Sequence, residues 1–175
     1  MLINRDRNPI FNRVLNPIFN RKINPVFNRD INPIFNRKIN PVFNRDINPV
    51  FNRDINPVFN RDINPFFNRN INPVFNRNIN PYFNRDINPI FNDNIKGYYI
   101  FDANSNTVTH FAIMIEKIFI FYNTENEFSM FAVKHNLNGY VIFSTSNEFI
   151  GHLEPNSENG FNYFDKNNFW KYYIN

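Results

Sequence analysis

Residues 39–54 read INPVFNRDINPVFNRD, which is one eight-residue unit in two successive copies. Nearly the same unit runs from residue 8 to residue 95, so eleven octads of the form N-P-x-F-N-R-x-I make up the first half of the chain. Phe and Ile (once Leu) alternate at every fourth position, and an Asn follows each of them until Ile95. Such a unit cannot bury its own apolar residues, so the repeat predicts a structure in which neighbouring copies bury one another.

The proline in every octad limits the backbone conformations that the repeat can adopt. It excludes a continuous helix, because each Pro removes a hydrogen-bond donor and clashes with the preceding turn at a cost of about 3 kcal/mol. A regular strand is excluded as well, since Pro interrupts the ladder, and polyproline II has a period of three, which matches neither four nor eight. Asn and Pro both favour turns. The pattern therefore predicts a coil with a corner at each Asn-Pro and each Asn-Arg.

We expect an all-β chain in which residues 1–95 form a four-sided β-solenoid of about 16 residues per coil, with coils about 4.8 Å apart. A coil of three octads, about 24 residues, remains an alternative, because like residues stack in any multiple of eight. The arrangement resembles the pentapeptide-repeat solenoids in its architecture, over residues 4–95, although the unit here is four residues and not five. The predicted inward ladder consists of Phe27, Phe35, Phe43, Phe51, Phe59, Phe67, Phe75, Ile31, Ile39, Ile47, Ile55, Ile63 and Ile71.

Two other interpretations of the octads remain. The region is either ordered in this way or a disordered array of short linear motifs. Each octad contains a segment such as NPVF (residues 40–43) or NPYF (residues 80–83), which resembles the NPx(Y/F) peptides read by phosphotyrosine-binding-type adaptor domains. The apolar positions barely vary while the x positions do, which favours the ordered interpretation.

Residues 96–175 contain a second, weaker repeat that begins with an aromatic cluster. GYYIF starts at Gly97, KIFIF at Lys117, GYVIF at Gly139 and GFNYF at Gly160, which gives spacings of 20, 22 and 21 residues. A polar turn with an Asn follows each cluster (Asn106, Asn126, Asn147 and Asn167), and then a second apolar run, which reads VTHFAIMI, FSMFAV, FIGHL or FWKYYI. Strand, Asn-rich turn and strand predict four β-hairpins in a small domain of their own. The units resemble the aromatic hairpin repeats of some bacterial cell-wall-binding modules, and the domain either caps the solenoid or binds a partner itself.

The composition excludes several classes of protein. Aromatic residues make up 18% of the chain, with 23 Phe, which is far more than disordered proteins contain. There is no Cys, so disulfides and thiolate metal sites are excluded. The first residues are charged and no apolar run approaches the length of a membrane span, so we expect no signal peptide or transmembrane segment, and a cytoplasmic or virion- or assembly-associated protein.

No group of residues predicts catalysis. The three histidines, His110, His135 and His152, have no zinc-site spacing, and two of them fall at nearly equivalent places in two hairpins, which favours a structural role. Ser and Thr lie mostly in turns without a nucleophile motif, and phosphate-binding glycine loops are missing. We therefore expect a non-enzymatic protein without a metal, a cofactor or a small-molecule substrate.

Ten of the eleven octads carry an arginine at the same position, and this series is the feature that most suggests a function. Residues 1–92 carry a net charge of +8 and residues 93–175 one of −4. In a solenoid the arginines form two outward columns that either pair with Asp of the next coil as structural ladders or bind the phosphates of a nucleic acid. These arginines are Arg21, Arg29, Arg37, Arg45, Arg53, Arg61, Arg69 and Arg77.

Taken together, these patterns predict a non-catalytic structural or interaction protein, a rigid rod that presents its hairpin domain. Only MLIN precedes the repeat, so we expect the uncapped solenoid end to self-associate through residues 1–15. On that interpretation, deletion of residues 1–7 changes the oligomeric mass. The alternative is binding of a nucleic-acid backbone, which weakens steeply as the salt concentration rises.

Overall fold

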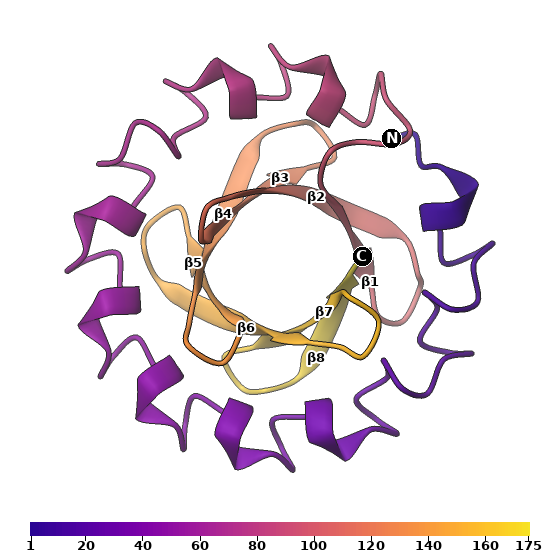
Figure 1. The fold of residues 1–175 in the computed structure, drawn as a ribbon, viewed down its shortest axis with the longest axis vertical. Helices are drawn as coiled ribbons and strands as arrows, with labels where there is room; N and C mark the ends of the chain where they lie inside the picture. Colours follow the sequence, from indigo (N-terminus) through magenta and orange to yellow (C-terminus); the bar gives the residue numbers. More distant parts are fainter.

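Eight antiparallel strands in the second half of the chain close into a barrel, in a computed structural model that describes residues 1–175 (Figure 1). Each strand pairs with the next one along the chain, and β8 pairs with β1 to complete the closure. The strands are β1 (Tyr98–Asp102), β2 (Val108–Ile115), β3 (Ile118–Asn123), β4 (Phe128–Lys134), β5 (Tyr140–Ser144), β6 (Phe149–Pro155), β7 (Phe161–Asp165) and β8 (Trp170–Ile174).

The hairpins form where the sequence predicts them, because both the strand and the turn signals are local. The predicted apolar run VTHFAIMI coincides with β2, and the other three predicted second strands overlap β4, β6 and β8. The turn residues Asn106, Asn126, Asn147 and Asn168 have φ between 57° and 67°. Asn adopts this left-handed conformation more readily than most residues. In the last turn the residue with positive φ is therefore Asn168 and not Asn167.

The two faces of the barrel carry two separate apolar clusters. Alternate strand residues point inward, and their side chains fill the interior; this cluster includes Phe119, Phe121, Tyr140 and Leu153. The residues between them point outward and build a second cluster that includes Phe111, Phe131 and Phe143. Since this outer face is as apolar as the inner one, the barrel needs a cover.

Residues 1–95 provide that cover as a belt that runs once around the barrel (Figure 1). The predicted four-sided β-solenoid is therefore wrong, and the hairpin domain fills the centre of the belt instead of capping the end of a rod. The belt contains no strand; it is a succession of tight turns, eight of which are short 3₁₀ helices. They are η1 (Arg5–Arg7), η2 (Arg29–Ile31), η3 (Arg37–Ile39), η4 (Arg45–Ile47), η5 (Arg53–Ile55), η6 (Arg61–Ile63), η7 (Arg77–Ile79) and η8 (Arg85–Ile87).

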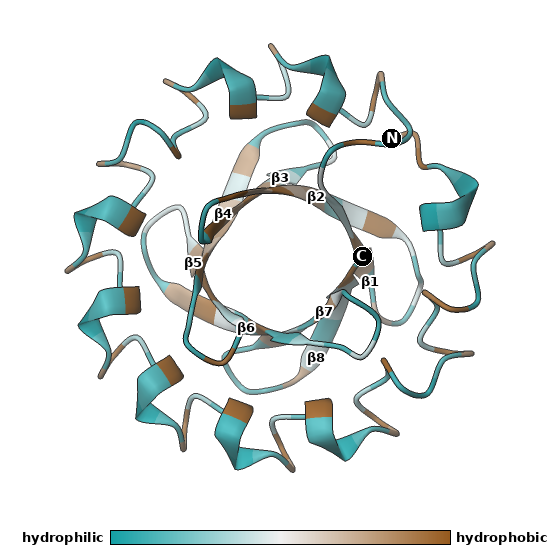
Figure 2. Ribbon diagram, in the orientation of Figure 1, coloured by the Kyte–Doolittle hydropathy of each residue, from teal (hydrophilic) through white to brown (hydrophobic).

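Each octad has an inner face made by I-N-P and an outer face made by x-F-N-R-x. Hydrophobic segments of the belt lie on the side that faces the barrel (Figure 2), and of the Ile residues Ile47, Ile55 and Ile71 are buried while Ile31, Ile39 and Ile63 are partly buried. The predicted inward Phe ladder is a second error, because the Phe side chains lie on the outer surface with 56–59% of their area exposed. These are Phe27, Phe35, Phe43, Phe51, Phe59, Phe67 and Phe75. The reason is that the barrel, and not the next coil, is the apolar surface on which the repeat packs.

Asparagine side chains bend the belt and also join its units. In Asn40 the side-chain oxygen accepts a hydrogen bond from the N–H of Val42 (2.9 Å), and the amide donates to the carbonyl of Pro33 in the preceding octad (2.8 Å). The second asparagine of the same octad, Asn44, accepts from the N–H of Asp46 (3.0 Å) and donates to the carbonyl of Lys38 (2.6 Å). This second arrangement recurs in all octads from Asn12 to Asn92.

The two ends of the belt are bonded to each other. The N–H of Leu2 donates to the carbonyl of Pro89 (2.6 Å), and the guanidinium of Arg7 donates to the carbonyls of Ile95 (2.8 Å) and Gly97 (2.5 Å). The free solenoid end on which the expected end-to-end association depends is therefore not present. None of the helices is long and apolar enough to cross a membrane.

Replacement of Ile47 and of Phe51 by Ala should have very different effects on stability. Ile47 has no exposed area, so Ile47→Ala should lower the free energy of unfolding by about 2–5 kcal/mol. Phe51→Ala removes a largely exposed ring and should cost about 1 kcal/mol or less. Chemical denaturation measures both, and equal losses would contradict the belt and support an inward Phe ladder.

Candidate functional site: the Arg–Phe row of the belt

The outer surface of the belt carries a row of stacked side-chain pairs, which we call the Arg–Phe row. In every pair the guanidinium lies over the ring of the Phe six residues later, with 4.7–5.1 Å between the guanidinium carbon and the ring centroid. The pairs are Arg5–Phe11, Arg13–Phe19, Arg21–Phe27, Arg29–Phe35, Arg37–Phe43, Arg45–Phe51, Arg53–Phe59, Arg61–Phe67, Arg69–Phe75, Arg77–Phe83 and Arg85–Phe91.

The turns of the belt fix where each arginine points. In η5, for example, Arg53 is the first helical residue and Asn52 is the N-cap, whose side chain accepts from the N–H of Asp54. The cap holds the backbone of Arg53 in one conformation, so the guanidinium reaches forward to Phe59 in the next octad. The same geometry repeats along the belt, and the row is therefore a preformed surface.

None of these arginines has a carboxylate within ion-pair distance. The ion pairs of the protein join Lys96 to Asp86 (3.3 Å) and Lys171 to Asp165 (3.6 Å), and the only other carboxylate close to a basic side chain is that of Glu154, which lies near two histidines. The predicted Arg–Asp ladders are thus replaced by Arg–Phe stacks. The predicted stacking of arginines in columns is also wrong, since the octads follow one another around the barrel instead of lying above one another (Figure 1).

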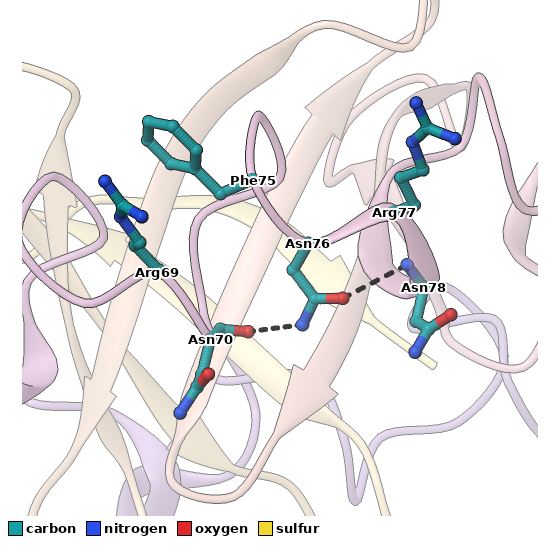
Figure 3. A pocket seen from close by; sticks show the side chains of 6 residues that line it. All are labelled: Arg69, Asn70, Phe75, Asn76, Arg77 and Asn78. Atoms are coloured by element: carbon teal, nitrogen blue, oxygen red, sulfur yellow. Dashed lines mark hydrogen bonds between the residues drawn. The ribbon is translucent and has the colours of Figure 1, made fainter.

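A shallow recess repeats between successive arginines of the row. Figure 3 shows the one lined by Arg69, Phe75, Arg77 and three asparagines. Its floor is held by Asn76, which donates to the carbonyl of Asn70 (2.6 Å) and accepts from the N–H of Asn78 (3.1 Å). Similar recesses lie between residues 5 and 13, 13 and 22, 29 and 38, and 45 and 54. Each combines positively charged groups with one exposed aromatic ring.

The charge of the chain is concentrated on the belt. Residues 1–95 contain fourteen Lys and Arg against seven Asp, a net charge of +7, whereas residues 96–175 contain five Lys against eight Asp and Glu, a net charge of −3. An anionic partner is therefore attracted to the belt and not to the barrel. The recess of Figure 3 is lined by arginine, asparagine and one ring alone, whereas the other four recesses also include at least one Asp or Glu.

The structure also brings together three residues that the sequence does not connect. His135, His152 and Glu154 lie side by side beneath the belt, whereas His110 lies apart against Tyr172. The alternation of His152 and Glu154 on one face of an otherwise apolar strand was the available signal. The role of Phe in the outer row was missed too, although the constant spacing of six from Arg to Phe was visible in every octad.

Comparisons with known proteins found no match: no family model, no curated protein and no solved structure matches this chain. The geometry of the Arg–Phe row is therefore the evidence on function.

A double-mutant cycle on Arg53 and Phe59 tests the row. The pair should show a coupling free energy of about 0.5–1 kcal/mol in the unfolding of Arg53→Gln, Phe59→Leu and the double variant. As a matched control, Arg53 and Phe51 are neighbours that do not stack, because Phe51 stacks with Arg45, so their coupling should be near zero. Equal coupling in the two cycles would mean that the stacks do not exist in solution.

Proposed function

We propose that this is a non-catalytic binding protein whose Arg–Phe row binds single-stranded nucleic acid. The observation that carries the proposal is the row itself, in which eleven guanidinium groups without a carboxylate partner alternate with eleven exposed rings around one belt. Such a surface combines the two features by which proteins hold single strands, namely positive charge along the backbone and aromatic platforms for bases.

The stacked guanidinium keeps its hydrogen-bonding capacity. Guanidinium donors point outward in the plane of the group, whereas the ring of Phe occupies only a face. A phosphate can therefore accept hydrogen bonds from an arginine that remains stacked, and the stack reduces the side-chain entropy that binding would otherwise cost. Contacts of this kind hold the backbone and carry no sequence information.

The rings favour a single strand over a duplex. The guanidinium of Arg69 lies over the ring of Phe75 at 4.9 Å, and 58% of the area of Phe75 is still exposed to solvent. Unpaired bases stack on such rings at roughly 1–3 kcal/mol per base, and every base has a face that can do so. The bases of a duplex are stacked on one another, so a duplex gains only the phosphate contacts. We therefore expect little sequence preference and a clear preference for single strands.

Self-association is the second candidate function, and a specific observation favours it. The residue after each Pro is exposed and apolar in every octad, as in Val50 (73% exposed) and Val74 (77% exposed). Exposed apolar patches of this extent mark surfaces that contact another protein. Assembly through these side chains persists at high salt, whereas binding to phosphates weakens.

Binding of a labelled oligothymidylate to two charge-matched double variants tests the proposal. Arg53→Gln/Arg61→Gln removes two charges from the row, and Lys117→Gln/Lys166→Gln removes two exposed charges from the barrel. We expect the first variant to bind several-fold more weakly and its plot of log K against log salt to be shallower by about 1.4, because each phosphate contact on a single strand contributes about 0.7. The second variant should bind like the unmodified protein.

Three results would contradict the proposal: no binding at low salt, equal binding of duplex and single strand, or equal losses in the two variants. A particle mass above one chain that does not fall as salt rises would instead support self-association.

A further inference from the structure

Three titratable side chains meet on the outer face of the barrel, under the belt. His135 directly follows β4, and His152 and Glu154 are alternate residues of β6. At most 1% of each side chain is exposed. The Oε1 atom of Glu154 lies 3.6 Å from Nε2 of His135 and 3.8 Å from Nδ1 of His152. These three atoms, together with Oε2 of Glu154, are buried without a hydrogen-bond partner.

The rings of His135 and His152 each make a hydrogen bond on the side away from Glu154. These bonds determine which nitrogen of each ring carries the proton. The N–H of Leu137 donates to Nδ1 of His135 (3.2 Å), so the proton of that ring is on Nε2 and points to Glu154. The amide of Asn168 donates to Asn40 (3.4 Å), so its oxygen faces Nε2 of His152 (3.2 Å) and accepts from it. This leaves Nδ1 of His152 as an acceptor that faces Glu154.

One proton between Glu154 and His152 completes this arrangement. A protonated Glu154 donates to Nδ1 of His152 and accepts from Nε2 of His135, once side-chain shifts of about 0.5–1 Å bring both contacts to hydrogen-bond length. Buried polar groups are paired in this way as a rule, because an unpaired one is costly. A second proton would put a positive charge in the cluster, and loss of the first would put a negative charge there.

Burial favours the uncharged form of all three groups. It raises the pKa of Glu154 to about 9. Burial, with the neighbouring charge of Lys134, lowers the pKa of His135 to about 4. Burial, with the field of His135, lowers the pKa of His152 to about 3. No acidic group offsets these effects, since Asp165 bonds its own turn and the charged residues of the overlying octads, Arg29, Asp30, Arg37 and Lys38, are exposed.

A metal ion does not explain the cluster. A metal would need the lone pair of His135 Nε2, and that position holds the proton of the ring. The geometry of the chain also contains no group of three His, Cys, Asp or Glu residues suited to a metal ion.

The cluster is linked to a part of the belt in which two successive Ile side chains are only partly buried. The chain of hydrogen bonds from His152 through Asn168 ends on Asn40, and Asn162 of β7 donates to the carbonyl of Ile23 (3.0 Å). Between these two points Ile31 and Ile39 are only partly buried, although Ile23 and Ile47 on either side are fully buried. Polar contacts therefore contribute to holding residues 24–40, where the apolar contacts of Ile31 and Ile39 are incomplete.

We propose that the proton shared by Glu154 and His152 latches belt residues 24–40 to the barrel, and that gain or loss of one proton releases this segment while the barrel stays closed. In the unfolded protein the two histidines become protonated below about pH 6.5, whereas in the folded protein they stay neutral until about pH 4 (His135) or 3 (His152). The latch therefore weakens as pH falls through this range. In the unfolded protein Glu154 loses its proton above about pH 4.5, whereas in the folded protein it keeps this proton to about pH 9. The latch therefore also weakens as pH rises through this range. The latch is strongest near pH 6.5.

Hydrogen exchange of the full-length protein, expressed as protection factors to remove the intrinsic effect of pH, tests the latch. We expect protection of residues 24–40 to fall by about tenfold or more between about pH 6.5 and 9.5, with strands β3 to β6 unchanged. In Glu154→Gln, which has nearly the same shape but no titratable proton, this fall should disappear. Glu148→Gln, at an exposed carboxylate in a hairpin turn, should behave like the unmodified protein.

Two results would overturn the latch: a fall in protection spread evenly over belt and barrel, or the same fall in Glu154→Gln. Imidazole nitrogen shifts of the unmodified protein keep the test independent of the folding of the variant. Both rings should be neutral between about pH 5 and 8, with the protons on Nε2, and a charged ring in this range would contradict the proposal. Added zinc should change neither measurement.

Discussion

The asparagine side chain that reaches back to the preceding octad is the interaction on which the belt depends. Adjacent turns form no sheet ladder, and Pro leaves each octad one backbone donor short. The amide of Asn44 supplies a bond between units, while its carbonyl oxygen closes the turn that follows. One residue type therefore both sets the curvature of the chain and joins its units, which is why two asparagines recur in every octad. Aspartate could close the turn but could not donate to the preceding unit.

The belt and the outer face of the barrel share one apolar cluster. The outer cluster joins Phe111, Tyr122 and Phe131 of the barrel to Ile55 and Ile71 of the belt. Polar contacts reinforce the interface, since the hydroxyl of Tyr122 donates to the carbonyl of Ile79 and that of Tyr99 to the carbonyl of Leu2. Without the barrel the Ile side chains of the belt have no surface on which to pack, and without the belt the aromatic outer face of the barrel is exposed. Each part supplies what the other lacks.

The sequence predicts what is local in this fold and misses what depends on distant residues. The strands and Asn turns of residues 98–174 follow from hydrophobic patterning and turn chemistry within about ten residues, and both are confirmed. In the octads, Phe43 and Ile47 are equivalent by spacing alone, and only the position of the barrel decides that Ile47 faces inward and Phe43 outward. The Arg–Phe row follows from that choice, since a Phe inside the core could not stack with a solvated arginine. The buried cluster joins His135 to residues almost twenty positions away, and no short-range pattern reveals such a contact.

Closure of the belt makes the number of octads a fixed dimension of the molecule. In an open tandem array, an in-frame gain or loss of one unit changes only the length, because the ends are free. Here Leu2 and Arg7 must meet Pro89 and Ile95, so the contour of the repeat has to equal the perimeter of the barrel. The belt has eleven octads and the barrel has eight strands, and these two numbers have no common divisor. Successive octads therefore lie at different positions relative to the strands beneath them. Copies that are nearly identical in sequence thus occupy unequal environments, and the most buried Ile and the least buried one are distinguished by their place on the circle alone.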